Sequence, residues 1–202
     1  MTGQEKNLWK HETLCFAEGK TVVCGADEAG AGPLAGAVFG AAVILPPHAE
    51  IAGLDDSKKL SEKKREQLFD IICETAVSFS VAWADVEEIE TINILNARML
   101  AIHRAIEGLS VRPQFALIDG NRSMGILCPN RTIVHGDGES ASIAAASILA
   151  KVSRDRYMKE MDGLYPGYLF AKHKGYGTKL HYEKLRELGP CPIHRLSFLK
   201  NL

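Results

Sequence analysis

Hydrophobic and polar residues recur along this chain with two periods, which predict strands interspersed with helices. Short apolar runs bounded by turn residues are typical of buried strands, and strict alternation is typical of a half-buried strand. The predicted strands cover residues 21–26, 34–45, 77–83, 115–118 and 132–134. The first two would form a hairpin, although the propensities of residues 34–42 also allow a helix.

Apolar residues spaced three or four positions apart predict helices between these strands. The predicted helices cover residues 61–75, 85–106, 140–161 and 180–188. Ser61 would cap the first of them, and Asp85 with Glu88 has the spacing of a helix-opening box. The order of the elements predicts an α/β fold, in which helices pack on the faces of a mixed sheet.

Length and composition allow one compact domain. The 202 residues, of which 46% are hydrophobic, suffice for a full core. We expect a single domain over residues 1–202, with an N-terminal extension at about residues 1–20 and a basic, helical C-terminal segment at about residues 163–202. No apolar run is long enough to span a membrane, and no apolar signal segment is present. The five cysteines never form a Cys-x-x-Cys pair, which disfavours disulfides and favours a reducing cytoplasm.

The net charge of −1 conceals an uneven distribution. Residues 151–202 contain 11 Lys and Arg against 5 Asp and Glu, whereas residues 1–150 contain 13 against 20. A basic section could steer a polyanion toward an acidic site that would otherwise repel it. Basic residues also commonly solvate surface helices, so the distribution alone leaves both explanations open.

Acidic residues stand where predicted strands end. Asp27 and Glu28 follow the first strand, Asp119 follows the strand at residues 115–118, and Asp137 lies between glycines ahead of a predicted helix. Any one of them alone is more often a turn or cap residue. Carboxylates gathered at one edge of an α/β sheet supply the oxygen ligands that Mg²⁺ and Mn²⁺ prefer. Together the acids therefore indicate metal-assisted phosphate chemistry.

Residues 30–36 form a glycine-rich loop that superficially resembles a dinucleotide-binding fingerprint. That fingerprint needs a helix directly behind the glycines to receive a pyrophosphate, whereas the residues after Gly36 have the pattern of a strand. Asp27 and Glu28 would also stand beside the phosphates without a neutralising ion. We therefore expect no nucleotide cofactor, and we expect the glycines to allow a tight turn or a close approach to a ligand.

A series of motifs in this chain resembles the ribonuclease HII family. They lie, in the family's order, at residues 25–36, 55–61, 117–121, 136–137, 142–155, 173–178 and 193–198. The resemblance implies a ribonuclease H-like fold and a metal-dependent endonuclease that hydrolyses the RNA strand of RNA–DNA hybrids. It also implies cutting on the 5′ side of ribonucleotides embedded in duplex DNA, with 3′-hydroxyl and 5′-phosphate ends, as ribonucleotide excision repair requires.

The same resemblance assigns roles to the acids. The family's four metal-site acids fall on Asp27, Glu28, Asp119 and Asp137, which would hold two Mg²⁺ or Mn²⁺ ions. Such a pair of ions clamps the attacking and leaving oxygens of an in-line displacement. The related ribonuclease HIII group is disfavoured because only about 20 residues precede the first strand.

The family's sugar-sensing elements, a Gly-Arg-Gly loop and a downstream tyrosine, fall on Gly30, Ala31, Gly32 and Tyr176. The 2′-hydroxyl that they sense is what separates RNA from DNA. Alanine at position 31 replaces the family's usual arginine, and Ala37 replaces its usual proline. Backbone recognition would survive at Ala31, whereas a charged grip on phosphate would be lost, which predicts weaker binding with the preference for ribose retained. Tyr176 could instead be a surface aromatic in a turn.

Basic residues in these motifs are candidates for contact with the nucleic-acid backbone, or for ordinary surface solvation. They are Lys58, Lys59, Lys151, Arg154, His173 and Lys174. His194 and Arg195 would instead position the C-terminal segment. Two other functions stay open at this point: a DNA-cutting nuclease on the same fold, and a non-catalytic binder of hybrids. The expected enzyme is a cytoplasmic monomer whose partner is an RNA–DNA hybrid or ribonucleotide-containing duplex DNA, with no membrane partner.

Overall fold

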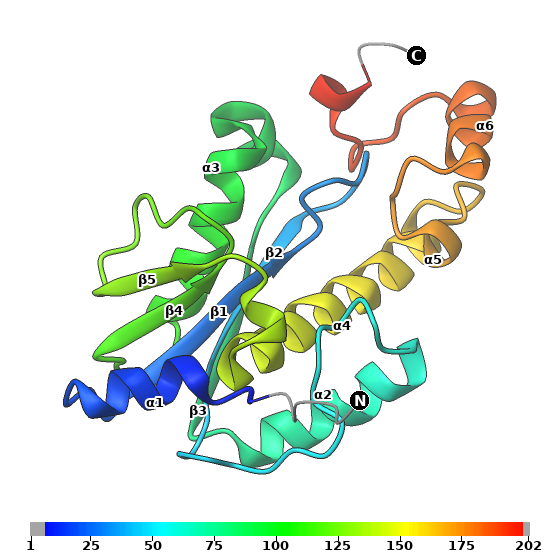
Figure 1. The fold of residues 1–202 in the computed structure, drawn as a ribbon. Coiled ribbons are helices and arrows are strands. Elements are labelled where there is room, and N and C mark those ends of the chain that lie inside the picture. Colours follow the sequence, from blue (N-terminus) through cyan, green and yellow to red (C-terminus); the bar gives the residue numbers. More distant parts are fainter. Residues whose placement is uncertain (1–6, 200–202) are drawn as a thin grey trace, which may run out of the picture.

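The computed structural model describes residues 7–199, and its centre is one mixed sheet (Figure 1). Five strands run in the order β3-β2-β1-β4-β5. They are β1 (Val23–Ala29), β2 (Val38–Ile44), β3 (Ser78–Ala84), β4 (Phe115–Asp119) and β5 (Asn130–Ile133). β2 pairs antiparallel with β1 and β3, whereas β4 runs parallel to β1 and β5 runs parallel to β4. The predicted α/β fold with a mixed sheet is thereby confirmed.

The predicted helices are present, together with shorter ones. They are α1 (Lys10–Ala17), α2 (Glu62–Thr75), α3 (Val86–Glu107), α4 (Ala141–Leu164), α5 (Phe170–His173) and α6 (Lys179–Leu188), with 3₁₀ helices η1 (Gly136–Gly138) and η2 (Leu196–Phe198). Ser61 caps α2 as predicted, and Asp85 and Glu88 form the reciprocal hydrogen bonds that open α3. These local signals fix where the helices start.

Helix α1 was not predicted, because its apolar residues form no continuous stripe. Its one buried acid, Glu12, accepts hydrogen bonds from the Ser140 hydroxyl at 2.6 Å and from the Ser142 amide at 2.9 Å. Both donors belong to the start of α4. Part of the expected N-terminal extension is therefore anchored to the domain, while residues 1–6 lie outside the described residues.

Helices cover both faces of the sheet, α3 on one side and α2 with α4 on the other (Figure 1). Two strand glycines allow the helices to lie very close. A Cβ atom on Gly25 of β1 would lie 2.1 Å from the Ser142 backbone in α4, and one on Gly40 of β2 would lie 2.5 Å from the Ala101 backbone in α3. The central strands are thus held between two helix backbones, which fixes the positions of the residues that follow Gly25.

The C-terminal segment packs against the far end of α4 and against the β1–β2 connection. Phe170 and Ile193 share a buried cluster with Met158 of α4. Main-chain bonds then join the segment to the connection, since the Leu34 amide donates to Gly175 and the Gly36 amide donates to Ile193, each at 2.8 Å. The prediction of a strand from residue 34 is wrong for residues 34–37, because these contacts hold them outside β2. The helical alternative is also wrong.

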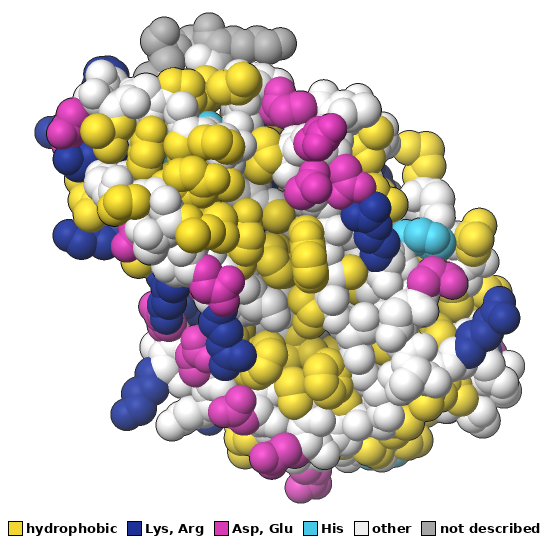
Figure 2. All heavy atoms as spheres, turned by 180° about the vertical axis from the view of Figure 1, so that it is seen from behind, with side chains coloured by type: hydrophobic (Ala, Val, Ile, Leu, Met, Phe, Trp, Pro, Cys, Tyr) yellow, Lys and Arg dark blue, Asp and Glu magenta, His cyan; other side chains and the backbone are white. Residues whose placement is uncertain are grey.

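The face of the molecule behind Figure 1 carries hydrophobic side chains between acidic and basic ones (Figure 2). Val77, Phe79 and Trp83 are exposed on or beside the edge strand β3. Within residues 7–199, none of the helices has both the length and the apolar character needed to cross a bilayer.

Candidate active site

Two neighbouring strands bring three of the four predicted acids together. Asp27 and Glu28 lie in β1, and Asp119 is the last residue of β4. The two strands are parallel, with Ala26 opposite Ile118, so the next residues along the register are Asp27 and Asp119. Because side chains alternate across a sheet, these two aspartates point to the same side. The register therefore places Asp27 beside Asp119, although β1 continues to Ala29, so Asp27 and Glu28 lie inside the strand and not after it as predicted.

The fourth acid, Asp137, comes from η1, directly after the chain leaves β5. The Gly136 amide donates a hydrogen bond to Oδ1 of Asp119 at 2.7 Å, which ties η1 to the end of β4. Asp137 is buried, and Nζ of Lys58 lies 3.6 Å from its Oδ2. Lys58 belongs to the loop between β2 and α2, so four separate segments meet here.

The acids lie within range of one another's charge. Burial, followed by the charges of Glu28 and Asp119, raises the pKa of Asp27 well above its ordinary value. Burial also raises the pKa of Glu28, against the opposing charge of Arg98, and the pKa of Asp137, where Asp119 adds to the effect. Buried carboxylates that repel one another are stabilised by a bound cation.

Arg98 is a site residue that the sequence did not mark. Its Nη2 atom lies 2.5 Å from Oε1 of Glu28, and it reaches the acids from α3 on the side of the sheet opposite α4. The ion pair holds the Glu28 carboxylate in one orientation. An arginine in the middle of a helix carries no sequence signal for this role, because its partner is 70 residues away along the chain.

The donor set fits Mg²⁺ or Mn²⁺ in chemistry. All four acids offer hard oxygen atoms, and Oε2 of Glu28 is buried without a hydrogen-bond partner. In the part of the chain that the structure describes, no three His, Cys, Asp or Glu side chains are gathered closely enough to hold a metal ion between them. The metal-binding role of the four acids stays a prediction.

The glycine-rich loop is held by a buried arginine, Arg195. It donates five hydrogen bonds of 2.7–3.0 Å to the carbonyl oxygens of Gly30, Ala31, Pro33 and Gly36. Gly30 has a φ of +96°, and a Cβ atom there would lie 2.0 Å from Nε of Arg154. Gly32 is exposed, with nothing within 4 Å of a Cβ position. The loop therefore has a fixed backbone and an open tip.

Tyr176 lies beside this loop. Its side chain is 42% exposed, and the guanidinium carbon of Arg154 and Nζ of Lys151 lie 5.5 and 5.9 Å from the ring centroid. Cations at this distance are attracted to an aromatic face. Because Arg154 also fills the space next to Gly30, the predicted tyrosine and the predicted loop are parts of one surface.

The predicted backbone-contacting residues fall into two groups. At least partly accessible are Lys58, Lys59, Lys151 and Lys174. Arg154 and His173 are buried, because Arg154 donates to the carbonyls of Ala35 and Ala37 and His173 uses both ring nitrogens within the protein. The structure turns these two side chains inward, a placement that the sequence did not indicate.

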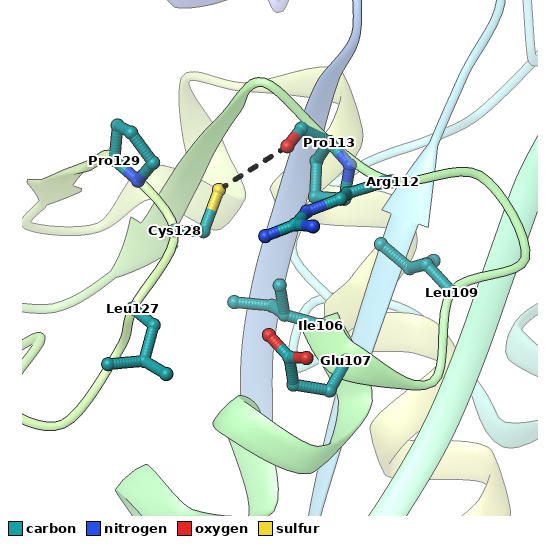
Figure 3. Close-up of a pocket in the computed structure, with 8 residues that line it drawn as sticks. All are labelled: Ile106, Glu107, Leu109, Arg112, Pro113, Leu127, Cys128 and Pro129. Carbon is teal, nitrogen blue, oxygen red and sulfur yellow. Dashed lines mark hydrogen bonds between the residues drawn. The ribbon is translucent and has the colours of Figure 1, made fainter.

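A pocket of about 300 Å³ lies elsewhere, between the end of α3 and the segments that precede β4 and β5 (Figure 3). Ile106, Leu127 and Cys128 are among its lining residues, and Sγ of Cys128 donates to the Pro113 carbonyl at 3.7 Å. These segments enter the parallel strands, whereas Asp119 stands where β4 ends. The pocket is therefore at the opposite end of the strands from the acids.

Known proteins resemble this chain in sequence and in fold. The family model of Ribonuclease HII matches residues 24–201. A curated ribonuclease HII of Caldicellulosiruptor bescii is 51% identical over 199 residues, which cover 98% of this chain and 97% of that protein. The crystal structure of ribonuclease H2 from Pyrococcus horikoshii OT3 has a TM-score of 0.70 at 23% identity, covering 87% of this chain and 93% of that one.

A further solved structure, Bst-RNase HIII in complex with Mn²⁺, has a TM-score of 0.63 at 20% identity and covers 84% of this chain and 63% of that one. The two solved structures resemble this chain in fold. The family model and the curated relative resemble it in sequence over nearly its whole length. The chain therefore belongs to the ribonuclease HII family and is a ribonuclease H, an endonuclease of the hydrolase class.

Proposed function

We propose that this enzyme uses two divalent metal ions to hydrolyse the RNA strand of RNA–DNA hybrids and to cut on the 5′ side of ribonucleotides embedded in duplex DNA. The observation that carries the proposal is the register of β1 and β4, which sets Asp27 and Asp119 at corresponding positions of adjacent parallel strands. Family membership supplies the substrate class.

The chain's own residues prepare the site for cations. Four carboxylates offset most of the charge of two dications, and Arg98 and the Gly136 amide hold two of them, Glu28 and Asp119, in fixed orientations. When bound here, Mg²⁺ or Mn²⁺ would make a hydroxide available near neutral pH and would stabilise charge on the leaving 3′-oxygen. The Mn²⁺ complex of Bst-RNase HIII supports this choice of ion.

Sugar selection is assigned to the loop and to the tyrosine beside it. Gly30, Ala31 and Gly32 would present backbone amides and carbonyls to the ribose, because Arg195 keeps the loop in one conformation. The half-exposed ring of Tyr176 would stack on the sugar or base beyond the ribonucleotide. Ala31 supplies the same backbone groups as arginine, so the preference for ribose is retained while a phosphate contact is lost.

The accessible lysines would contact phosphates on either side of the cut. Lys58 stands next to Asp137, and Lys151 lies close to Tyr176, so both border the proposed reaction centre. Lys59, Lys174 and the buried Arg154 and His173 complete the set proposed to contact or support the substrate. We further propose that the enzyme is a monomer. We also propose that it acts in the cytoplasm, where reducing conditions keep cysteines free, as all five are in the structure.

The proposal is tested with a labelled DNA duplex that carries one ribonucleotide, beside an all-DNA duplex of the same sequence. The wild-type enzyme should cut the first duplex 5′ of the ribonucleotide with Mg²⁺ or Mn²⁺, leave the second intact, and be inactive in EDTA. The products should carry 3′-hydroxyl and 5′-phosphate ends. Metal-dependent cutting of both duplexes would indicate a general DNA nuclease, and tight binding without cutting would indicate a recognition module.

A further inference from the structure

Ribose selection of the proposed kind needs the glycine loop and Tyr176 to be held in a fixed mutual position. We propose that His181, His194 and Arg195 are positioning residues that fix Tyr176 and the loop of residues 30–32 relative to each other. The inference rests on the proposed function and names no further contact with substrate. His194 and Arg195 are neighbours in the chain; His194 is linked to Tyr176 through His181, and Arg195 binds the loop directly.

The arm that reaches the loop is the side chain of Arg195. This side chain is 0% exposed, and each of its five side-chain hydrogen bonds ends on a backbone carbonyl oxygen. The guanidinium donates these bonds to carbonyl groups of the glycine-rich loop, among them those of Gly30 and Ala31. The Arg195 amide also donates to the Leu34 carbonyl at 2.8 Å. The guanidinium also lies 5.3 Å from the ring centroid of Phe198, so a buried cation with a fixed position holds the carbonyl groups of the loop and thereby fixes its conformation.

The arm that reaches the tyrosine is a chain of hydrogen bonds with a fixed direction. The Cys191 amide can only donate, and it donates to Nδ1 of His194 at 2.9 Å, so the proton of neutral His194 is on Nε2. That Nε2 donates to Nε2 of His181 at 3.0 Å, which places the proton of His181 on Nδ1. Nδ1 of His181 then donates to the Tyr176 carbonyl at 3.0 Å.

Packing keeps these rings in place. The His181 ring stacks on that of His173 with centroids 4.2 Å apart and planes inclined by 17°, and Phe170 meets His181 edge-on at 84°. His173 is itself fixed, because its Nδ1 accepts from the Gly175 amide and its Nε2 bonds to the Tyr168 carbonyl. The Gly175 amide and the carbonyl of Tyr176 itself are thus both held by histidine nitrogens.

A metal site is the obvious alternative for three histidines near a cysteine. The ring nitrogens of His173, His181 and His194 all have hydrogen-bond partners, however, and no metal-binding group of three such side chains is found within the described residues. Among the described residues, each ring nitrogen of the cluster is therefore already engaged within the protein. The cluster therefore serves to hold the backbone at Gly175 and Tyr176 in place.

Two substitutions of His181 separate positioning from simple packing. In His181→Asn the side-chain amide nitrogen takes the place of Nδ1 and can still donate to Tyr176, whereas in His181→Gln the amide nitrogen takes the place of Nε2 and cannot. We expect His181→Gln to raise KM for the ribonucleotide-containing duplex at least fivefold, with kcat within twofold of wild type. His181→Asn should restore KM to within twofold, even though both variants lose the same imidazole.

The same measurement in a Tyr176→Ala background provides the control for mechanism. If His181 acts through Tyr176, His181→Gln adds nothing to KM once the tyrosine ring is gone. For the loop, Arg195→Lys keeps the charge but not the fork of donors, and should lower the ratio of cutting between the ribonucleotide duplex and the all-DNA duplex. If His181→Gln does not fold, His194→Asn and His194→Gln provide a second pair, since only the glutamine can still donate to His181.

The results separate the two levels of inference. A wild-type enzyme that fails to cut the ribonucleotide duplex contradicts the proposed function itself. An active wild type together with folded His181→Gln and His181→Asn variants of equal KM overturns the positioning role. The role would also be overturned if His181→Gln raised KM by the same factor in the wild type and in Tyr176→Ala, because His181 would then not act through the tyrosine.

Discussion

At the scale of single residues, Asp119 combines a structural and a chemical task that one substitution can separate. Its Oδ1 accepts the Gly136 amide, which an asparagine oxygen can also accept, so Asp119→Asn should keep the fold. The lost negative charge should lower kcat by at least roughly 100-fold, with little change in duplex binding. Mn²⁺ should raise the Tm of the wild type, because a ligand bound only by the folded state stabilises it, and should raise that of the variant less.

Glu160→Gln serves as the matched control, since this acid is exposed on α4 away from the four carboxylates. Both its kcat and its Mn²⁺-dependent rise in Tm should equal those of the wild type. Near-wild-type turnover of Asp119→Asn, measured on the ribonucleotide-containing duplex, would remove Asp119 from the proposed machinery.

Position 31 tests what the missing arginine would contribute. The Ala31 carbonyl is bound by Arg195, whereas its side chain is partly exposed at the loop tip. Ala31→Arg should therefore lower KM and steepen the salt dependence of binding by about one phosphate contact, with the preference for ribose unchanged. Ala31→Gln has a long side chain without charge and should show neither effect. If KM and the salt dependence of binding are unchanged in Ala31→Arg, the loss of a phosphate-binding charge at position 31 does not weaken substrate binding.

At the scale of elements, the close contact between β1 and α4 is set by one glycine. A methyl group at position 25 would clash with the Ser142 backbone, so Gly25→Ala should destabilise the protein by roughly 2–3 kcal/mol and displace Asp27, two residues on. Gly163 near the end of α4 has nothing within 4 Å of a Cβ position, so Gly163→Ala should stabilise by about 0.5–1 kcal/mol. Urea unfolding measures both, and equal effects would contradict the packing argument.

The histidine cluster between α5 and α6 predicts a dependence of stability on pH. Burial, reinforced by the neighbouring His173 and His194, lowers the pKa of His181 from its ordinary value to about 4. Above pH 6.5 neither state binds the proton, whereas between pH 6.5 and about 4 the unfolded chain binds it and the folded chain does not. Stability should therefore fall as the pH falls, by roughly 2 kcal/mol from pH 7 to pH 5 for His181 alone.

Urea unfolding at both pH values should show a smaller fall for His181→Asn, which has no group to titrate there. The other groups facing this ring are the histidines at 173 and 194, whose pKa values burial also lowers, so part of the fall persists in the variant. An identical pH dependence of the variant and the wild type would contradict the assignment.

Local signals predicted the elements well, because apolar runs and helix caps act over a few residues. Ser61 and Asp85 marked helix starts, and Asp27 and Asp119 could be placed at one edge because each follows a buried run. Arg195 was expected to position the C-terminal segment, and its hold on the glycine-rich loop could not be predicted, because its partners are carbonyl groups as far as 165 residues away and a backbone carbonyl has no sequence signature. The inward turn of Arg154 escaped prediction for the same reason.

At the scale of the whole molecule, the basic C-terminal section is less of a free positive surface than its composition suggests. Apart from Lys151, which borders the proposed reaction centre, ion pairs join Arg156 to Glu66, Lys159 to Glu62, Lys179 to Glu183 and Lys184 to Glu187. Arg154 and Arg195 are buried on loop carbonyls. Figure 2 shows basic side chains beside acidic ones on the face it presents. Most of these charges therefore solvate and brace helices.

This pairing predicts a modest salt dependence of duplex binding. If only the accessible lysines at positions 58, 59, 151 and 174 neutralise phosphates, the slope of log K against log salt should be about −3 to −4 for an all-DNA duplex. Lys58→Gln should reduce its magnitude by about 0.9. Lys184→Gln should leave the slope unchanged, because Lys184 is 2.7 Å from Glu187 on the surface of α6. A wild-type slope near −8, or an equal effect of the two variants, would mean that the paired C-terminal charges release their partners to bind nucleic acid.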